Sequence, residues 1–188
     1  MLRDLKFQII DILESTEEIR FSQAALQMID KIKKRYPENS RKSALIPVLH
    51  IAQAESGGWL SPHVMDYVAD MLGIKPVEVY EVATFYTLFN LKPAGRYIFE
   101  VCRTGPCCLC GAEEIISYLE SKLNIKTGET TSDGMFTIKT VDCLAACGNA
   151  PVIKVGVDYH ENMNNDKIDL LVDNLHLENR SSHQNPYE

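Results

Sequence analysis

Four of the chain's six cysteines fall into two pairs, and each pair follows a short stretch typical of a β-strand. Cys102 and Cys107 form a C-x4-C pair, and Cys143 and Cys147 form a C-x3-C pair. Thiolates at these spacings can converge on one iron–sulfur cluster. Residues 148–151 (Gly-Asn-Ala-Pro) then form a turn sequence that exposes backbone N–H groups, which stabilise charge on sulfur. Cysteines that only packed a core would not need this arrangement.

The length and the N-terminus indicate where such cysteines would operate. A chain of 188 residues can bury a core without disulfides. The first residues lack an apolar signal-peptide core, and Asp4, Asp11 and Glu14 disfavour a transit peptide. We therefore expect a reducing, cytoplasmic setting, where an even number of cysteines indicates metal or catalytic ligation rather than disulfides.

Composition excludes two classes of partner. No apolar run reaches the roughly 18 residues that a membrane span requires, so we expect no direct membrane insertion. The formal net charge is −7 and no basic stripe is present. Because phosphate binding depends on clusters of lysine and arginine, nucleic acid is not expected as a partner.

Helical patterns give way to strand patterns near residues 91–95, which we take as a domain boundary. Before it, apolar spacing and capping residues predict a helical N-terminal domain over residues 1–94. Its four expected helices cover residues 19–36, residues 43–55, a segment from Pro62 to the stop at Gly73, and a segment that begins near Pro76.

The last of these helices is apolar over more than one stripe, through the run from Val79 to Phe89. Such a helix is either buried or in contact with a partner. The aromatic residues Phe85, Tyr86 and Phe89 suit a core and an interface equally well, so both interpretations stay open.

After the boundary, the expected elements follow the order β-α-β-β-α, which predicts an α/β layer over residues 95–178. The expected strands cover residues 96–101, 137–141 and 152–157, and the expected helices cover residues 111–123 and 166–175. Residues 179–188 form a polar tail. The complete chain is therefore expected to be an α+β protein.

Other metal or redox sites use the same cysteines differently. Cys102, Cys107 and Cys110 match the plant-type ferredoxin spacing C-x4-C-x2-C, with Cys143 far enough downstream to be a fourth ligand. Against this set, a helix pattern starts directly after Cys110, and Cys147 is left without a role. The spacing favours the two-pair set without eliminating the plant-type set.

Two further alternatives remain open. Cys107 and Cys110 could form a C-x-x-C redox dithiol at a helix N-terminus, where the helix dipole lowers the pKa of a thiol. That interpretation ignores the downstream pair. A structural zinc site with four cysteines is the second alternative, although zinc ribbons usually take their ligands from C-x2-C knuckles.

Several stretches together resemble one known family over roughly residues 21–175. They are residues 44–53 (ALIPVLHIAQ), 58–61 (GWLS), 79–86 (VYEVATFY), 131–134 (TSDG) and 143–151 (CLAACGNAP). The chain resembles the E subunit family of NADH-quinone oxidoreductase, the small [2Fe-2S] flavoprotein subunit of respiratory complex I.

The resemblance implies a helical N-terminal bundle followed by a thioredoxin-like α/β [2Fe-2S] ferredoxin domain. The family's cluster ligands fall on four positions of this chain: Cys102, Cys107, Cys143 and Cys147. Two departures concern the surrounding loops. Cys108 and Cys110 stand where relatives usually carry other residues, and Ala145 replaces a common glycine.

The chain has no G-x-G motif, Walker-type loop or H-E-x-x-H motif, so it offers no recognisable phosphate-binding loop for NADH or flavin, and we expect hydride chemistry to occur on another subunit. By resemblance, FMN and NADH are bound by a partner flavoprotein subunit, and this chain is an electron-transfer subunit of NADH dehydrogenase with no catalytic residue of its own. The resemblance also implies a heterodimer with that partner, within a peripheral arm on the cytoplasmic side of a membrane. The equivalent diaphorase subunit of an NAD-linked hydrogenase or formate dehydrogenase is the alternative.

Overall fold

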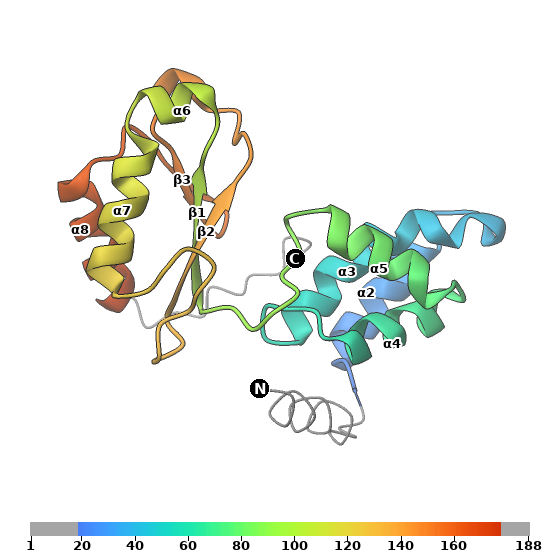
Figure 1. Cartoon of the computed structure of the whole chain (residues 1–188). Helices are drawn as coiled ribbons and strands as arrows, with labels where there is room; N and C mark the ends of the chain where they lie inside the picture. The colour runs from blue at the N-terminus through green and yellow to red at the C-terminus, as the bar shows by residue number, and fades with distance from the viewer. Residues whose placement is uncertain (1–18, 178–188) are drawn as a thin grey trace, which may run out of the picture.

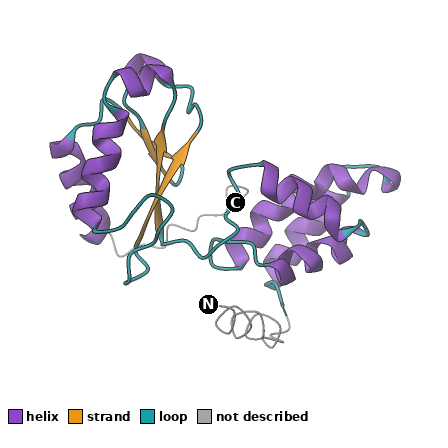
Figure 2. Ribbon diagram, in the orientation of Figure 1, coloured by secondary structure: helices purple, strands orange, loops and turns teal. Residues whose placement is uncertain are grey.

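The structure is a computed structural model, and it describes residues 19–177. The described chain forms two bodies, a group of helices followed by a sheet with helices packed against it (Figure 1). Colouring by secondary structure shows that all strands lie in the second body (Figure 2). The polar tail expected at residues 179–188 lies outside the described residues, as does the beginning of the segment 1–94.

The first body contains four α-helices and one 3-10 helix. In chain order they are α2 (Gln23–Lys33), η1 (Glu38–Ala44), α3 (Leu45–Glu55), α4 (Pro62–Leu72) and α5 (Pro76–Phe85). The core between them is apolar and well buried, with Val48, Leu49 and Leu72 fully excluded from solvent. Burying one such side chain stabilises the fold by about 1.5–3 kcal/mol, so the helices gain their stability from this shared core.

The ends of helix α4 follow directly from local sequence. The Ser61 hydroxyl accepts a hydrogen bond from Val64 N at 3.2 Å, and Pro62 occupies the first helical position. Gly73 ends the helix in the left-handed conformation, with φ 65°. These are the roles that N-cap serine, N1 proline and C-terminal glycine usually have, and they confirm the prediction.

The helix at residues 43–55 and the last helix differ from the prediction at their ends. Residues 38–44 form the 3-10 helix η1, so α3 begins only at Leu45. Helix α5 begins at Pro76 as predicted but ends at Phe85, because Tyr86 adopts an extended conformation with φ −88° and ψ 113°. The apolar run continues to Phe89, but Leu88 and Phe89 lie beyond the helix. Apolar periodicity therefore extended the expected helix too far.

The second body is built on a four-stranded sheet with the order β2-β1-β3-β4. Its strands are β1 (Tyr97–Cys102), β2 (Phe136–Val141), β3 (Ile153–Val155) and β4 (Asp158–His160). Strands β1 and β2 are parallel, whereas β3 is antiparallel to both β1 and β4. The sequence predicted a single strand over 152–157. Instead, Gly156 adopts φ 62° and turns the chain into a β3–β4 hairpin.

The helices of this body are α6 (Gly105–Leu109), α7 (Ala112–Leu123) and α8 (Asn165–Leu177), and η2 (Cys147–Asn149) is a short 3-10 turn. Helices α7 and α8 lie beside the sheet, on the side away from the first body (Figure 1). Phe99 of β1 and Phe136 of β2 are buried under them, with ring centroids 5.6 Å apart. The expected β-α-β-β-α order is confirmed, with α6 and the extra strand added.

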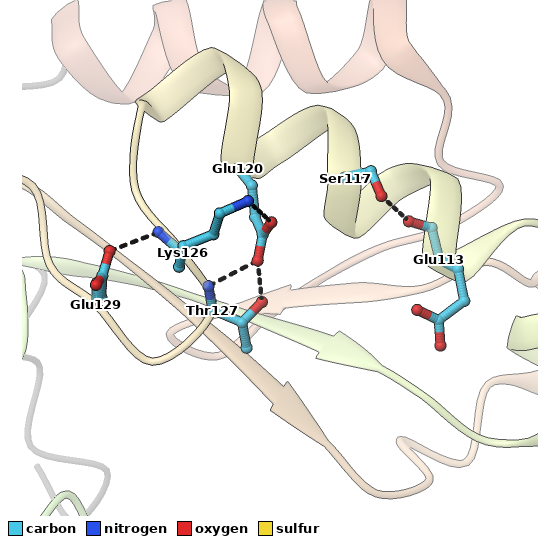
Figure 3. Close-up of polar contacts among 6 residues, drawn as sticks. All are labelled: Glu113, Ser117, Glu120, Lys126, Thr127 and Glu129. Atoms are coloured by element: carbon cyan, nitrogen blue, oxygen red, sulfur yellow. Dashed lines mark hydrogen bonds and ion pairs between the residues drawn. The ribbon is translucent and has the colours of Figure 1, made fainter.

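A carboxylate fixes the loop that leads from α7 back to the sheet (Figure 3). Glu120 accepts hydrogen bonds from Thr127 N at 2.8 Å and from the Thr127 hydroxyl at 2.9 Å, and it pairs with Lys126 at 2.9 Å. The hydrogen bonds from Lys126 and Thr127 lower the pKa of Glu120 to about 2. The carboxylate therefore stays charged at neutral and mildly acidic pH, and it fixes the start of the loop that leads from α7 to β2.

The two bodies meet close to the end of β2. Lys139 Nζ donates to the carbonyl oxygen of Thr87 and, at 3.1 Å, to Asn90 Oδ1 in the segment after α5. Burial lowers the pKa of Lys139.

Within residues 19–177, no helix has the length and apolar character needed to cross a membrane.

Candidate iron–sulfur centre

Parallel pairing brings the two cysteine loops to one edge of the sheet. Cys102 ends β1 and is aligned with Val141, the last residue of β2. The chain leaves both strands at the same edge, so the loop that contains Cys107 and the loop that contains Cys143 begin next to each other. This is the edge at which α6 lies in Figure 1. The two cysteine pairs, which are far apart in sequence, therefore share one location.

The upstream pair forms the inner part of the site. Cys102 and Cys107 are each 1% exposed and pack with Ala112 and Val152 in a small apolar cluster. The Cys102 amide also donates to Val152 O at 3.1 Å, which fixes the end of β1 against the start of β3. The rigid sheet and the short helix α6 thus position both sulfurs.

The downstream pair forms the outer part of the site. Cys143 Sγ and Cys147 Sγ are 3.8 Å apart, and both residues are exposed. Ala145 N donates to Cys143 Sγ at 3.3 Å. Ala145 itself adopts φ 60°, the left-handed conformation in which glycine is usual. This explains why a glycine suits position 145, and why alanine there carries backbone strain.

The pKa shifts of Cys102, Cys107 and Cys147 show how closely the two pairs interact. Burial acts to raise the pKa of Cys102, but hydrogen bonds from the Thr104 hydroxyl and the Leu144 amide outweigh it, and the pKa is lowered. Burial and the hydrogen bond with Cys102 raise the pKa of Cys107 to about 11, and charge on Cys147 adds to that rise. The outer pair is therefore within electrostatic reach of the inner pair.

Cys147 shows the same coupling from the other side. The hydrogen bond with Cys143 and the charge on Cys143 raise the pKa of Cys147, and charge on Cys102 contributes. Cys107 and Cys147, whose pKa values are raised, would ionise more readily beside a cation, because a bound metal deprotonates coordinating thiols. The donor set therefore fits a metal group with four thiolate ligands.

The arrangement suits a binuclear group better than a single ion. A structural zinc ion requires four ligands in one tetrahedron. Two separate cysteine pairs match a [2Fe-2S] cluster, in which four thiolates are divided between the irons.

The two remaining cysteines, of which Cys110 belongs to the plant-type set and to the C-x-x-C dithiol, lie on the surface. Cys108 is exposed on α6, and Cys110 is exposed where α6 ends. Leu109, between them, is 90% exposed. The structure brings Cys102, Cys107, Cys143 and Cys147 into mutual contact or electrostatic reach, and it leaves the side chains of Cys108 and Cys110 facing solvent.

Sequence reasoning did not identify Thr104, whose hydroxyl lies 3.3 Å from Cys102 Sγ. The signal in the sequence was Thr104-Gly105-Pro106, because threonine at the N-cap and proline in the first turn are typical of a helix start. That signal predicts a cap, and it does not indicate a contact with sulfur.

Comparisons with known proteins agree with this geometry. The family described as thioredoxin-like [2Fe-2S] ferredoxin matches residues 29–176. The E subunit of the NADH-quinone oxidoreductase from Rickettsia conorii is 44% identical over 155 residues, which cover 82% of this chain and 93% of the relative. The mitochondrial NADH dehydrogenase [ubiquinone] flavoprotein 2 of Dictyostelium discoideum is also 44% identical over 155 residues, covering 82% of this chain and 63% of that protein.

Solved structures show the same fold. The crystal structure of an NAD+-reducing [NiFe]-hydrogenase in the air-oxidized state superimposes with a TM-score of 0.64 and 18% identity, over 77% of this chain. This chain spans only 25% of that hydrogenase chain, so the likeness concerns the fold alone. The family match and the identity to the Rickettsia relative carry the assignment. The chain belongs to the thioredoxin-like [2Fe-2S] ferredoxin family, and within it to the E subunits of NADH-quinone oxidoreductase.

Proposed function

We propose that this chain is the electron-transfer subunit of an NADH-quinone oxidoreductase and holds one [2Fe-2S] cluster. When bound, the cluster supplies a one-electron acceptor for the reduced FMN of a partner NADH-binding subunit. The observation that carries the proposal is the meeting of two cysteine pairs at one sheet edge, in a chain 44% identical to a known member of that family.

The proposed ligands are Cys102, Cys107, Cys143 and Cys147. The inner pair is held by β1 and α6, and the outer pair by the loop after β2, which contains Cys143, and by η2, which begins at Cys147. The protein's own contribution is to orient these sulfurs, to exclude water from the inner pair and to donate hydrogen bonds to sulfur. None of these side chains is suited to hydride transfer, so that chemistry belongs to the partner flavoprotein subunit.

We also propose that the chain divides into a helical domain over residues 1–94 and a cluster domain over residues 95–178. Support comes from the two buried cores, one confined to Phe21–Phe89 and the other to Tyr97–Leu175. The helical domain would dock on the flavoprotein subunit, because Phe85 is 77% exposed and Tyr86 and Leu88 are also exposed beyond the helical core. Phe89 is buried, so of the three aromatic residues only it belongs to that core.

The heterodimer would lie in the peripheral arm of the complex, on the cytoplasmic side of the membrane.

A pull-down of the flavoprotein subunit tests the docking surface with the full-length Phe85→Ser variant. The matched control is Leu170→Ser on the remote helix α8, where the Leu170 side chain is 64% exposed. Weaker binding by Phe85→Ser alone supports the proposal. Equal binding by all three proteins would show that docking does not use this surface.

The cofactor proposal is tested on the purified full-length protein. We expect a brown protein with about two irons per chain that becomes paramagnetic on strong reduction. A colourless protein with stoichiometric zinc would refute the cluster.

The ligand set is tested by a matched pair of cysteine variants. Cys147→Ser should abolish or shift the cluster spectrum, because it removes a thiolate that fixes the cluster charge. Cys110→Ser should leave the spectrum nearly unchanged, since the Cys110 side chain faces solvent. Loss of the spectrum in Cys110→Ser, with an intact spectrum in Cys147→Ser, would establish the plant-type set instead.

The alternative assembly is a diaphorase module of an NAD-linked hydrogenase or formate dehydrogenase, which would use the same cluster with a different final acceptor. Mass spectrometry of the subunits that copurify with the chain separates the two. Copurifying quinone-reducing subunits support the proposal, and copurifying hydrogenase or formate dehydrogenase subunits would replace it with the alternative.

A further inference from the structure

Thr104 occupies a capping position without acting as a side-chain cap. It is the N-cap residue of α6, with φ −114° and ψ 168°, but its hydroxyl accepts no hydrogen bond from the helix. Threonine at an N-cap normally accepts one from a backbone N–H of the first turn. The hydroxyl of Thr104 is therefore directed to another partner.

That partner is the sulfur of Cys102. Thr104 Oγ1 lies 3.3 Å from Cys102 Sγ, and either atom could be the donor while Cys102 is a thiol. A ligating cysteine is a thiolate, which can only accept, so in the loaded protein the Thr104 hydroxyl is the donor. Cys102 is 1% exposed, so bulk water does not readily replace this donor.

The contact differs in kind from the neighbouring contact on Cys143. Cys143 Sγ accepts from the backbone amide of Ala145, which every residue type except proline provides. The donation from Thr104 Oγ1 depends on the identity of a side chain. A single substitution at Thr104 can therefore remove this hydrogen bond to Cys102 without replacing a cluster ligand or a backbone donor.

We propose that Thr104 is a positioning residue that raises the reduction potential of the cluster by donating a hydrogen bond to the sulfur of Cys102. The inference rests on the proposed function, since it requires the cluster and Cys102 as a ligand. One-electron reduction adds negative charge to a cluster that four thiolates already make anionic. A hydrogen-bond donor stabilises the reduced form more than the oxidised form, so removing it makes reduction less favourable.

The test uses three full-length variants. Thr104→Val is nearly isosteric and removes the hydroxyl, and a β-branched residue suits the extended backbone at this position. Thr104→Ser keeps a hydroxyl. The matched control Thr84→Val removes an exposed hydroxyl that bonds to Tyr80 O on α5, in the other body. For each protein, iron content and absorbance are measured first, and the midpoint potential is then determined by a redox titration followed by electron paramagnetic resonance.

We expect Thr104→Val to retain its iron and to be reduced about threefold to tenfold less favourably, which corresponds to a midpoint about 30–60 mV more negative for one electron. Thr104→Ser and Thr84→Val should stay close to the wild-type potential. A Thr104→Val potential equal to wild type would overturn the inference, as would an equal shift in Thr104→Ser.

If Thr104→Val fails to assemble a cluster, Thr104→Ala replaces it and the same shift is expected. If Thr104→Ser loads and neither Thr104→Val nor Thr104→Ala does, the hydroxyl serves assembly and the inference is refuted. Failure of the proposed function has a different signature, because the wild-type protein itself would then contain no iron–sulfur cluster.

Discussion

Gly95 lies at the junction between the two bodies, and we expect Gly95→Ala to destabilise the sheet domain strongly. A Cβ atom at this position would lie 2.8 Å from the carbonyl carbon of Phe136, 2.9 Å from its nitrogen and 3.0 Å from the carbonyl carbon of Met135. The optimum for such contacts is about 3.5–4.0 Å, so the chain would have to move by about 0.7 Å. These neighbours are backbone atoms of the loop and strand β2, and they cannot rotate away.

A hydrogen bond opposes that movement. Gly95 N donates to Thr137 Oγ1 at 2.6 Å, within the sheet domain. Overpacking costs about 1–3 kcal/mol, and weakening a hydrogen bond costs about 1 kcal/mol. The expected loss in the free energy of unfolding is therefore about 2–4 kcal/mol.

Urea denaturation measures this loss. With an m value of about 2 kcal/mol per molar urea, a loss of about 3 kcal/mol lowers the midpoint by about 1.5 M. Gly105→Ala is the matched control, because a Cβ at Gly105 meets nothing within 4 Å and alanine favours the helical conformation of α6. Equal midpoints for Gly95→Ala and Gly105→Ala would refute the steric argument.

Three further perturbations have defined outcomes. Ala145→Gly should raise the urea midpoint, since it removes about 1 kcal/mol of backbone strain at φ 60° and keeps the amide that donates to Cys143. A lower midpoint would contradict this. Glu120→Gln should lower the free energy of unfolding at neutral pH, and its difference from wild type should shrink as the pH falls from about 4.5 to about 2. The reason is that a carboxylate whose pKa is depressed in the folded state stabilises the fold above its unfolded pKa. It loses this effect as it becomes protonated. A difference that stays constant over this pH range would show that the charge of Glu120 is unimportant. Lys139→Met should make residues 91–95 more sensitive to limited proteolysis without altering cluster absorbance, because it removes the donor to Thr87 O and Asn90 Oδ1. Unchanged proteolysis would indicate that this lysine does not hold the two bodies together.

Elements with local stop and start signals could be predicted from sequence, and those without such signals could not. Ser61, Pro62 and Gly73 define the ends of α4 through their own chemistry, so this helix is found where it was expected. The run after Phe85 has no such signal. Its apolar spacing predicts a longer helix, and only the extended backbone of Tyr86 shows where α5 ends.

The candidate site follows the same division. The spacing of the cysteines and the resemblance to a family were enough to propose Cys102, Cys107, Cys143 and Cys147 as ligands, because ligand types and short spacings are written in the chain itself. The resemblance also indicated that Ala145 stands where the family commonly has glycine, without giving the reason.

The tertiary structure alone decided how these residues meet. The alignment of Cys102 with Val141 depends on pairing between strands that are separated by α6 and α7, and no local signal specifies that register. The left-handed backbone of Ala145 and the direction of the Thr104 hydroxyl are likewise consequences of packing around the loops. The sequence determined which sulfurs are available. Long-range strand pairing determined which of them face one another and which hydrogen-bond donors they meet, because pairing brings together residues that are distant along the chain.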